Sequence, residues 1–560
     1  MQAFAHLLDR LSYEPRRNGK IALMEAYFRA APDPERGYAL AALTDDLFFQ
    51  HAKPGLIRAL INERTDPVLF GLSRDYVGDL SETVALMWPR RPPAVEPGFI
   101  GHNQPPGVRL SEVIVGLQTI GKAALPGQLA AWLDSLDEIG RWALLKLITG
   151  ALRVGVSARL AKTAVARLGA VEVNAVEEVW HGLAAPYDTL FAWLEGRGPR
   201  PESLDPAPFR PVMLANPTDL DELNRTQSPA DFAGEWKWDG IRIQIAAGLD
   251  PTGRRIVRLY SRSGEDISAA FPDIVDAVDF EGALDGELLI VRDNVIQTFA
   301  VLQQRLNRKT VSAKLLRDFP AHVRLYDILT DGTEDVRPLP FAERRARLLA
   351  LAERLGPRFD VSPTFDFSTW DEVATARETP EAAGAGSDAP AVEGVMLKRW
   401  DSAYVPSRPK GPWFKWKRDP MLVDAVMMYA QRGSGKRSSF YSDYTFGVWS
   451  GEGEAAELVP VGKAYFGFTD AELKEIDRYV RNNTVNRFGP VREVRHDADH
   501  GLVLEIAFEG LNRSQRHKSG VAMRFPRVAR LRWDKLPHEA DRLETLQRYL
   551  HPESNQALLL

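Results

Sequence analysis

Residues 1 to about 200 place apolar side chains at intervals of three and four, which is the period of an amphipathic helix. The stretch GQLAAWLDSLDEIGRWALLKLITGALRVGVSARLAKTAVARLG is typical of this region. Ser157 is a suitable N-cap for its last helix and Gly169 a suitable C-cap. Strand-like alternation is rare here. The pattern therefore predicts an all-α domain over residues 1–200.

After residue 211 the pattern changes to the alternation of half-buried strands. Ile241, Ile243 and Ile245 alternate with polar residues, and GALDGELLIV predicts a turn at Asp285-Gly286. The helical stretch FAERRARLLALAERL interrupts the strands, so residues 212–418 are predicted to form an α+β domain. Strands resume in DAVMMYA, YTFGVWS and LVLEIAFEG, which predicts a smaller β-rich domain, such as a barrel, over residues 419–560.

Two segments have the composition of irregular chain. EGRGPRPESLDPAPFRP is dense in proline and polar residues, and we expect its second part, residues 201–211, to link the first two domains. ETPEAAGAGSDAPA, residues 378–391, is expected to be a surface loop. A chain of 560 residues agrees with about three domains.

Composition limits the possible chemistry. The chain has no cysteine, which excludes disulfides, thiolate nucleophiles and cysteine-ligated zinc. No apolar run is long enough for a membrane span, and the first residues lack the order of a secretion signal, so a cytoplasmic protein is expected. The net charge of -5 does not by itself indicate a nucleic-acid partner, because it averages over all faces.

The most informative string is Glu235-Trp236-Lys237-Trp238-Asp239-Gly240-Ile241-Arg242. A lysine in a strand-rich core is a candidate nucleophile when burial or neighbouring cations keep its amine neutral. Further short motifs follow in order; they are Ser261-Arg262-Ser263-Gly264-Glu265-Asp266, Asp285-Gly286-Glu287, Leu325-Tyr326-Asp327-Ile328-Leu329, Glu393-Gly394-Val395-Met396-Leu397-Lys398, Trp413-Phe414-Lys415-Trp416-Lys417, Arg524-Phe525-Pro526-Arg527 and Arg532-Trp533-Asp534-Lys535.

This ordered set resembles the motifs of the covalent nucleotidyltransferases, and the chain as a whole is similar to bacterial ATP-dependent DNA ligases. The resemblance implies nick sealing in DNA repair, replication or recombination, with ATP as co-substrate and release of AMP and pyrophosphate. Lys237 would carry the AMP. Lys417 would contact the α-phosphate with help from Lys415. Glu393 would be a ligand of Mg²⁺, with Mn²⁺ as a substitute, and Glu287 would hold the ribose of the nucleotide and also support the metal.

The resemblance also implies a nucleotide pocket. Tyr326 matches the aromatic residue that stacks on adenine, and Glu235 matches the carboxylate that reads the adenine amino group. Arg242 and Arg262 match arginines that bind the nucleotide or the 5′-phosphate of the nick. Lys398, the last residue of its motif, is assigned to nucleotide binding as well.

Outside the central domain, the resemblance implies three further features. Arg527, Asp534 and Lys535 would orient the leaving pyrophosphate from an OB-fold domain that closes over the nucleotide. The N-terminal helical domain would bind DNA phosphates, with contributions from Arg153, Arg159 and Lys162. The partner would be nicked double-stranded DNA, and the enzyme a monomer in the bacterial cytoplasm, associated with the nucleoid.

Three rival functions remain to be separated. An mRNA capping guanylyltransferase shares the lysine motif, but the helical N-terminal region and Glu235 argue against it. An NAD-dependent ligase normally has a cysteine-ligated zinc module, which this chain lacks. A catalytically silent DNA clamp would not need the charged C-terminal motif.

Two other strings resemble binding motifs but are rejected. Gly433-Ser434-Gly435-Lys436-Arg437-Ser438 lacks the first glycine and the final Ser or Thr of a P-loop, and we interpret it as a basic loop near DNA. His496-Asp497-Ala498-Asp499-His500 has the composition of a metal cluster but is expected to be a solvated turn.

Overall fold

The computed structural model describes residues 1–550 except for residues 78, 90–106, 151, 203–204, 307–310, 434–439, 452, 454–455 and 515–516. The chain divides into two compact units. One comprises Met1–Gly169, Ala185–Phe191 and Pro420–Leu560, and the other comprises Ala170–Ala184 and Ala192–Asp419. Among the described residues, no helix has both the length and the apolar character that a membrane crossing requires.

The N-terminal part of the first unit is helical, as the sequence predicts. Its helices are α1 (Gln2–Tyr13), α2 (Arg17–Ala30), α3 (Glu35–Leu43), α4 (Pro54–Asn62), α5 (Pro67–Val77), α6 (Leu80–Met87), α7 (Leu110–Thr119), α8 (Leu125–Ser135), α9 (Glu138–Thr149) and α10 (Ala158–Ala166). The Ser157 hydroxyl accepts a hydrogen bond from the Leu160 amide, which confirms the predicted N-cap. The expected cap at Gly169 is wrong, because a 3₁₀ turn follows α10 and the left-handed residue is Ala170.

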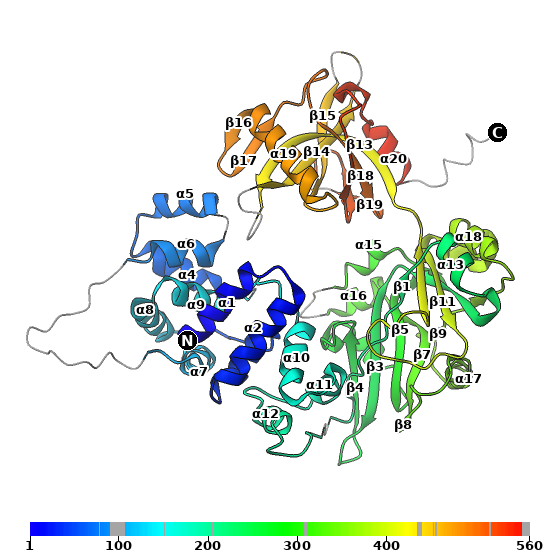
Figure 1. Cartoon of the computed structure of the whole chain (residues 1–560). Helices are drawn as coiled ribbons and strands as arrows, with labels where there is room; N and C mark the ends of the chain where they lie inside the picture. Colours follow the sequence, from blue (N-terminus) through cyan, green and yellow to red (C-terminus); the bar gives the residue numbers. More distant parts are fainter. Residues whose placement is uncertain are drawn as a thin grey trace, which may run out of the picture. The chain divides into compact units, whose positions relative to one another are not determined.

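The second unit contains two sheets with helices around them (Figure 1). The first sheet has the order β1 (Asn216–Pro217), β12 (Trp413–Lys417), β11 (Val392–Arg399), β2 (Phe232–Trp238) and β10 (Thr364–Phe365). The second has the order β4 (Arg255–Ser261), β3 (Ile241–Leu249), β5 (Gly282–Arg292), β7 (Ala321–Asp331) and β8 (Glu334–Asp335), with β6 (Val295–Ile296) on β5 and β9 (Phe359–Val361) on β7.

Helices of the second unit cover these sheets. They are α11 (Val173–Trp180), α13 (Leu220–Thr226), α14 (Pro272–Val275), α15 (Phe299–Leu302), α16 (Ala313–Asp318), α17 (Phe341–Ala352) and α18 (Trp370–Glu378), while α12 (Asp188–Leu194) contains residues of both units. Ile243 and Ile245 of β3 pack in one core with Leu348 of α17, which confirms the predicted alternation. The opposite face of β3 is left for polar residues.

The C-terminal part of the first unit is β-rich, as expected. Its elements are β13 (Met421–Arg432), β14 (Tyr441–Ser450), β15 (Glu457–Ala464), α19 (Asp470–Asn483), β16 (Thr484–Phe488), β17 (Val491–Val494), β18 (Val503–Phe508), β19 (Gly510–Arg513), β20 (Val521–Arg524), β21 (Arg527–Arg532) and α20 (Leu543–Arg548). Strand β13 pairs with β14 on one edge and with β17 and β18 on the other. Helix α19 buries Ile476 and Val480 against the strands.

Two local expectations are wrong, and the predicted linker is partly packed. Asp285-Gly286 is not a turn but the interior of β5, where the register with β7 shifts. Residues 381–391 are not a loop but two short helical turns whose Ala389 and Ala391 are buried. Part of the expected linker is packed, because Phe209 is buried against Tyr260. In each case a tertiary contact overrides local composition.

Candidate active site

Three neighbouring strands bring the central candidates together. Lys237 on β2 and Lys417 on β12 are both paired with Gly394 of β11. The Lys237 Nζ lies 2.5 Å from Oε1 of Glu393, and the Lys417 Nζ lies 3.2 Å from Oε2 of the same carboxylate. Burial alone would raise the pKa of Glu393, but the two ammonium charges outweigh it and lower that pKa.

A bulge in β11 explains why Glu393 faces this site. Val395 and Leu397 are buried in the core, and simple alternation would turn Glu393 to the same side. The pairing of β11 with β2 shifts between Val392 and Gly394, and this irregularity directs Glu393 to the two lysines. Gly394 has a φ of 148°, and a Cβ there would lie 2.3 Å from the Trp416 carbonyl oxygen. Only glycine fits this position.

The second sheet contributes Glu287. It lies on β5 opposite Arg242 of β3, on the face turned away from the Ile243 core. Burial raises the pKa of Glu287 to about 7; the charge of Lys237 opposes the shift and that of Glu393 adds to it. Gly240 allows this approach, because a Cβ there would lie 2.7 Å from Cγ of Glu287. The glycine of the Lys-x-Asp-Gly string therefore has a packing role.

Further cations lie around this centre. Lys415 is two residues from Lys417 and on the same face of β12. Burial and the charges of Arg408, Lys237 and Arg262 lower the pKa of Lys415. Burial and neighbouring arginines also lower the pKa of Arg262, although its side chain is exposed. This concentration of positive charge suits a polyphosphate ligand.

Arg242 is engaged by protein groups. Its Nη2 donates to Oδ2 of Asp285 at 2.5 Å and to the Tyr404 hydroxyl at 3.0 Å, and its Nη1 donates to the Met213 carbonyl at 2.6 Å. The Asp285 side chain is fully buried. A phosphate contact by Arg242 stays a prediction, and its observed role is to join β3, β5 and the segment before β1.

Glu235 is buried in an ion triad. Its Oε1 accepts from Arg345 Nη1 at 2.8 Å, and its Oε2 lies 2.7 Å from Lys398 Nζ. The side chains of Glu235 and Lys398 each expose 2% of their surface. Lys398 also donates to the Tyr326 carbonyl at 3.1 Å, and its ammonium lies 4.7 Å from the Tyr326 ring centre. Glu235, Lys398 and Tyr326 therefore form one cluster, as one nucleotide pocket requires.

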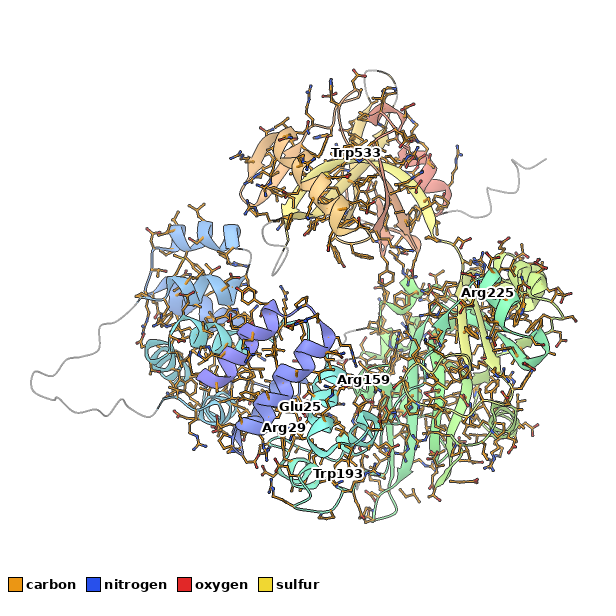
Figure 2. All side chains as sticks on the ribbon, viewed as in Figure 1. Glu25, Arg29, Arg159, Trp193, Arg225 and Trp533 are labelled. Carbon is orange, nitrogen blue, oxygen red and sulfur yellow. The ribbon has the colours of Figure 1, made fainter. Side chains whose placement is uncertain are left out.

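The predicted pyrophosphate residues lie in the first unit. Lys535 is 2.6 Å from Oδ2 of Asp424, and Asp534 is paired with Arg532 at 2.9 Å. Arg527 lies 3.7 Å from Glu509. The exposed Trp533, labelled in Figure 2, precedes Asp534 in this motif. Their action on the nucleotide stays a prediction.

The three predicted DNA-contacting cations differ in exposure. Arg153 is exposed, with a left-handed φ of 52°. Arg159 is half-buried on α10, where Figure 2 labels it. Lys162 is 8% exposed, and its contact with DNA stays a prediction. The helix packs this face inward, together with Ala161 and Val165.

The two rejected strings, residues 433–438 and 496–500, both lie in the C-terminal part of the chain. His500 and Asp497 lie in an irregular segment before β18, with Nδ1 2.9 Å from Oδ1. Within the described part of the chain, no group of three or more His, Asp or Glu side chains could hold a metal ion. Residues 434–438 of the rejected P-loop string lie outside the described residues.

Sequence reasoning missed Arg345, Asp285 and Tyr404 as parts of the site. A pattern could have identified Arg345, because the buried stripe of α17 consists of Phe341, Arg344, Arg345, Leu348 and Leu351. A charged residue at an apolar stripe position indicates a buried ion pair. No local pattern indicated Tyr404, which reaches Asp285 across 119 residues at 2.6 Å.

Two family models match the chain. The model described as "ATP dependent DNA ligase domain" matches residues 212–417 and the one described as "ATP dependent DNA ligase C terminal region" matches residues 437–535. The first match contains all the nucleotide-site candidates, and the second contains Arg527, Asp534 and Lys535.

Relatives and solved structures extend the likeness to nearly the whole chain. The "Probable DNA ligase" of Koribacter versatilis is 30% identical and covers 99% of this chain and 97% of the relative. "DNA ligase 1" of Korarchaeum cryptofilum is 28% identical over 98% of this chain and 97% of the relative. The solved structure "Pmar-Lig_PreS3" covers 94% of this chain and 99% of its own at 14% identity and a TM-score of 0.54, which supports the fold alone. The chain thus belongs to the family of ATP-dependent DNA ligases.

Proposed function

We propose that this chain joins the 3′-hydroxyl and 5′-phosphate of a nick in duplex DNA through an adenylate on Lys237. The observation that carries the proposal is the pairing of Lys237 with Glu393 at 2.5 Å, with Lys417 on the second oxygen of that carboxylate. Glu287 and Lys415 complete a site that contains a nucleophile, acidic groups and phosphate-binding cations.

In the first step the neutral amine of Lys237 attacks the α-phosphorus of ATP. The nitrogen–phosphorus bond forms as the bond to the pyrophosphate oxygen breaks, and the proton that the amine loses passes to solvent. Glu393, which is within hydrogen-bond distance, orients the amine. Lys417 and Lys415 stabilise the charge that develops on the α-phosphate oxygens. Arg527, Asp534 and Lys535 orient the pyrophosphate as it leaves.

The next two steps use the DNA. An oxygen of the nick 5′-phosphate attacks the phosphorus of the lysyl adenylate, which transfers AMP to the DNA and restores the lysine amine. The 3′-hydroxyl then attacks the activated 5′-phosphorus, the phosphodiester bond forms, and AMP leaves. Throughout, Tyr326 stacks on the adenine and Arg262 holds a phosphate.

The donor set of Glu287 and Glu393 fits Mg²⁺. This ion is commonly bound by one or two carboxylates together with substrate phosphates and water, so a larger cluster of protein ligands is not needed. The pKa of Glu287 is raised partly by the charge of Glu393, which agrees with two carboxylates near one cation position. A bound Mg²⁺, or Mn²⁺ in its place, would neutralise charge on the phosphate oxygens.

The finer architecture belongs to the same proposal. Residues 1–200 form a DNA-binding domain, residues 201–211 a linker, residues 212–418 the adenylation domain, and residues 419–560 an OB-fold domain that closes over the nucleotide and reopens for DNA. Arg153 and Arg159 contact DNA phosphates. The enzyme acts as a monomer on nicked duplex DNA in the cytoplasm.

The test is covalent labelling. The protein is incubated with Mg²⁺ and ATP, GTP or NAD labelled on the transferable phosphate, without DNA, and then run on a denaturing gel. Label from ATP alone is expected for the wild type, and Lys237→Ala should abolish it because the attacking amine is gone. Lys314→Ala removes an exposed lysine of the same unit and should label normally.

The second half of the test uses a nicked duplex with a labelled 5′-phosphate. Wild type and Lys314→Ala should seal it, and Lys237→Ala should not. Retained labelling in Lys237→Ala would refute the assignment of the nucleophile. Labelling from GTP would favour the capping reaction, and labelling from none of the three nucleotides would favour a silent DNA clamp.

A further inference from the structure

Arg345 makes two anchored contacts beside the nucleotide site. Its Nη1 donates to Oε1 of Glu235 at 2.8 Å, and its Nη2 donates to the Ser362 carbonyl at 2.9 Å. Ser362 in turn accepts from the Trp238 indole at 2.9 Å through its hydroxyl and donates its amide to the Leu325 carbonyl. The guanidinium is therefore fixed between α17, β2 and the end of β9.

Glu235 is in position to meet the base of a nucleotide attached to Lys237. The two residues are separated by one position on β2, so their side chains share a face of the strand. The Tyr326 carbonyl accepts a hydrogen bond from Lys398, which is the second cation paired with Glu235. An ionised carboxylate only accepts hydrogen bonds, so it favours the 6-amino group of adenine over the 6-oxo group of guanine.

The two cations that hold Glu235 are not equivalent. Burial lowers the pKa of Lys398, although the charge of Glu235 opposes that shift. An arginine guanidinium, in contrast, is always charged in a protein. Arginine therefore supplies the buried Glu235 side chain with a permanent counter-charge.

We propose that Arg345 is a positioning residue that fixes the orientation of the Glu235 carboxylate and thereby makes the site select a 6-aminopurine nucleotide. This inference rests on the proposed role of Lys237 and of the pocket at Glu235. Arg345 itself does not touch the nucleotide. Its removal should therefore change which nucleotide is used more than it changes the chemistry at Lys237.

The experiment measures kcat/KM for covalent labelling of the full-length protein with ATP and with GTP. Arg345→Gln and Arg345→Met remove the charge and should lower the ATP-to-GTP ratio at least about tenfold, since the Glu235 carboxylate loses one of the two cations that hold it in place. Most of the change is expected in KM for the two nucleotides. Arg345→Lys restores a charge and should recover most of the ratio.

Arg347→Gln is the matched control, because Arg347 lies on the same helix and pairs with Glu334 at the surface. It should keep the wild-type ratio. An unchanged ratio in a labelled Arg345→Gln or Arg345→Met protein would overturn the proposal. So would an equal loss in Arg345→Lys, or a failure of both charge-free variants to fold, which would make the role structural. A wild-type protein without label from any nucleotide would instead refute the proposed function.

Discussion

Asp79 combines two tasks in one side chain of the helical region. It accepts from the Glu82 amide as the N-cap of α6, and its other oxygen lies 2.6 Å from the Lys146 Nζ on α9. The Lys146 side chain exposes 7% of its surface, so its charge depends on this partner. Burial would raise the pKa of Asp79, but the Lys146 hydrogen bond and charge and the cap amide lower it.

Asp79→Asn tests this pair. Asparagine also caps helices, so the substitution removes the charge and should reduce the free energy of unfolding by about 2 kcal/mol near neutral pH. A carboxyl with a lowered folded-state pKa stabilises the fold above its ordinary value of 3.8 and loses this effect as the pH falls through the folded-state pKa. The difference from wild type should therefore disappear in acid, as measured by urea unfolding.

Asp66→Asn is the control for that measurement. Asp66 accepts from the amides of Val68 and Leu69 at the start of α5 and is exposed there. Its replacement should change stability by less than about 0.5 kcal/mol at every pH. Equal effects of the two substitutions would mean that the ion pair with Lys146 does not stabilise the fold.

At the scale of elements, the bulge of β11 determines the active site. At Gly394 the strand approaches β12 so closely that a Cβ would not fit. The register shift beside Gly394 also directs the Glu393 side chain out of the core. Helix α17 shows a second case, because it presents Arg344 and Arg345 along the stripe that helices of this kind fill with apolar side chains. Arg344 is fully buried with Asp327 at 2.8 Å.

Gly394→Ala should disrupt this strand pair. The new Cβ would overlap the Trp416 carbonyl, so β11 and β12 must separate locally and Glu393 must move away from Lys237. We expect a loss of about 2–3 kcal/mol in stability and a fall in labelling from ATP of at least about a hundredfold. Gly356→Ala, at a position with open space and an ordinary φ, should leave both unchanged. Normal labelling in Gly394→Ala would show that the bulge is not required.

At the scale of the whole molecule, the proposed catalytic groups are divided between the two compact units. Lys237, Glu287, Glu393, Lys415 and Lys417 belong to one unit, and Arg527, Asp534 and Lys535 to the other. In the proposed mechanism the C-terminal motif acts on pyrophosphate alone. The first chemical step therefore needs the residues of both units, whereas the later two steps need only the residues of the unit that contains Lys237. The steps can therefore be separated experimentally.

Lys535→Ala should slow labelling from ATP by about a hundredfold, because a cation that stabilises the leaving pyrophosphate is lost. Sealing of a nick that already carries AMP on its 5′-phosphate should stay near the wild-type rate, since no pyrophosphate is released there. Lys518→Ala, which breaks an exposed pair with Glu457, should leave both rates unchanged. Equal defects in the two assays would contradict a role confined to the first step.

The sequence by itself determined the helical start, the β-rich end and the family, because period, glycine placement and the order of short motifs are local properties of the chain. It also identified Lys237, Glu393 and Lys417, which the structure brings within one hydrogen-bonded group. Local periodicity fails where long-range contacts compete with it, as in the turn expected at Asp285-Gly286 and the loop expected over residues 378–391.

Only the tertiary structure decided which charged groups meet. Glu235 is joined to Arg345 across 110 residues, and Arg242 to Tyr404 across 162. A buried charge needs a partner, but its sequence neighbours do not specify which one, because the pairing follows from how the strands and helices pack. The direction of Glu393, reversed by the bulge at Gly394, was decided in the same way.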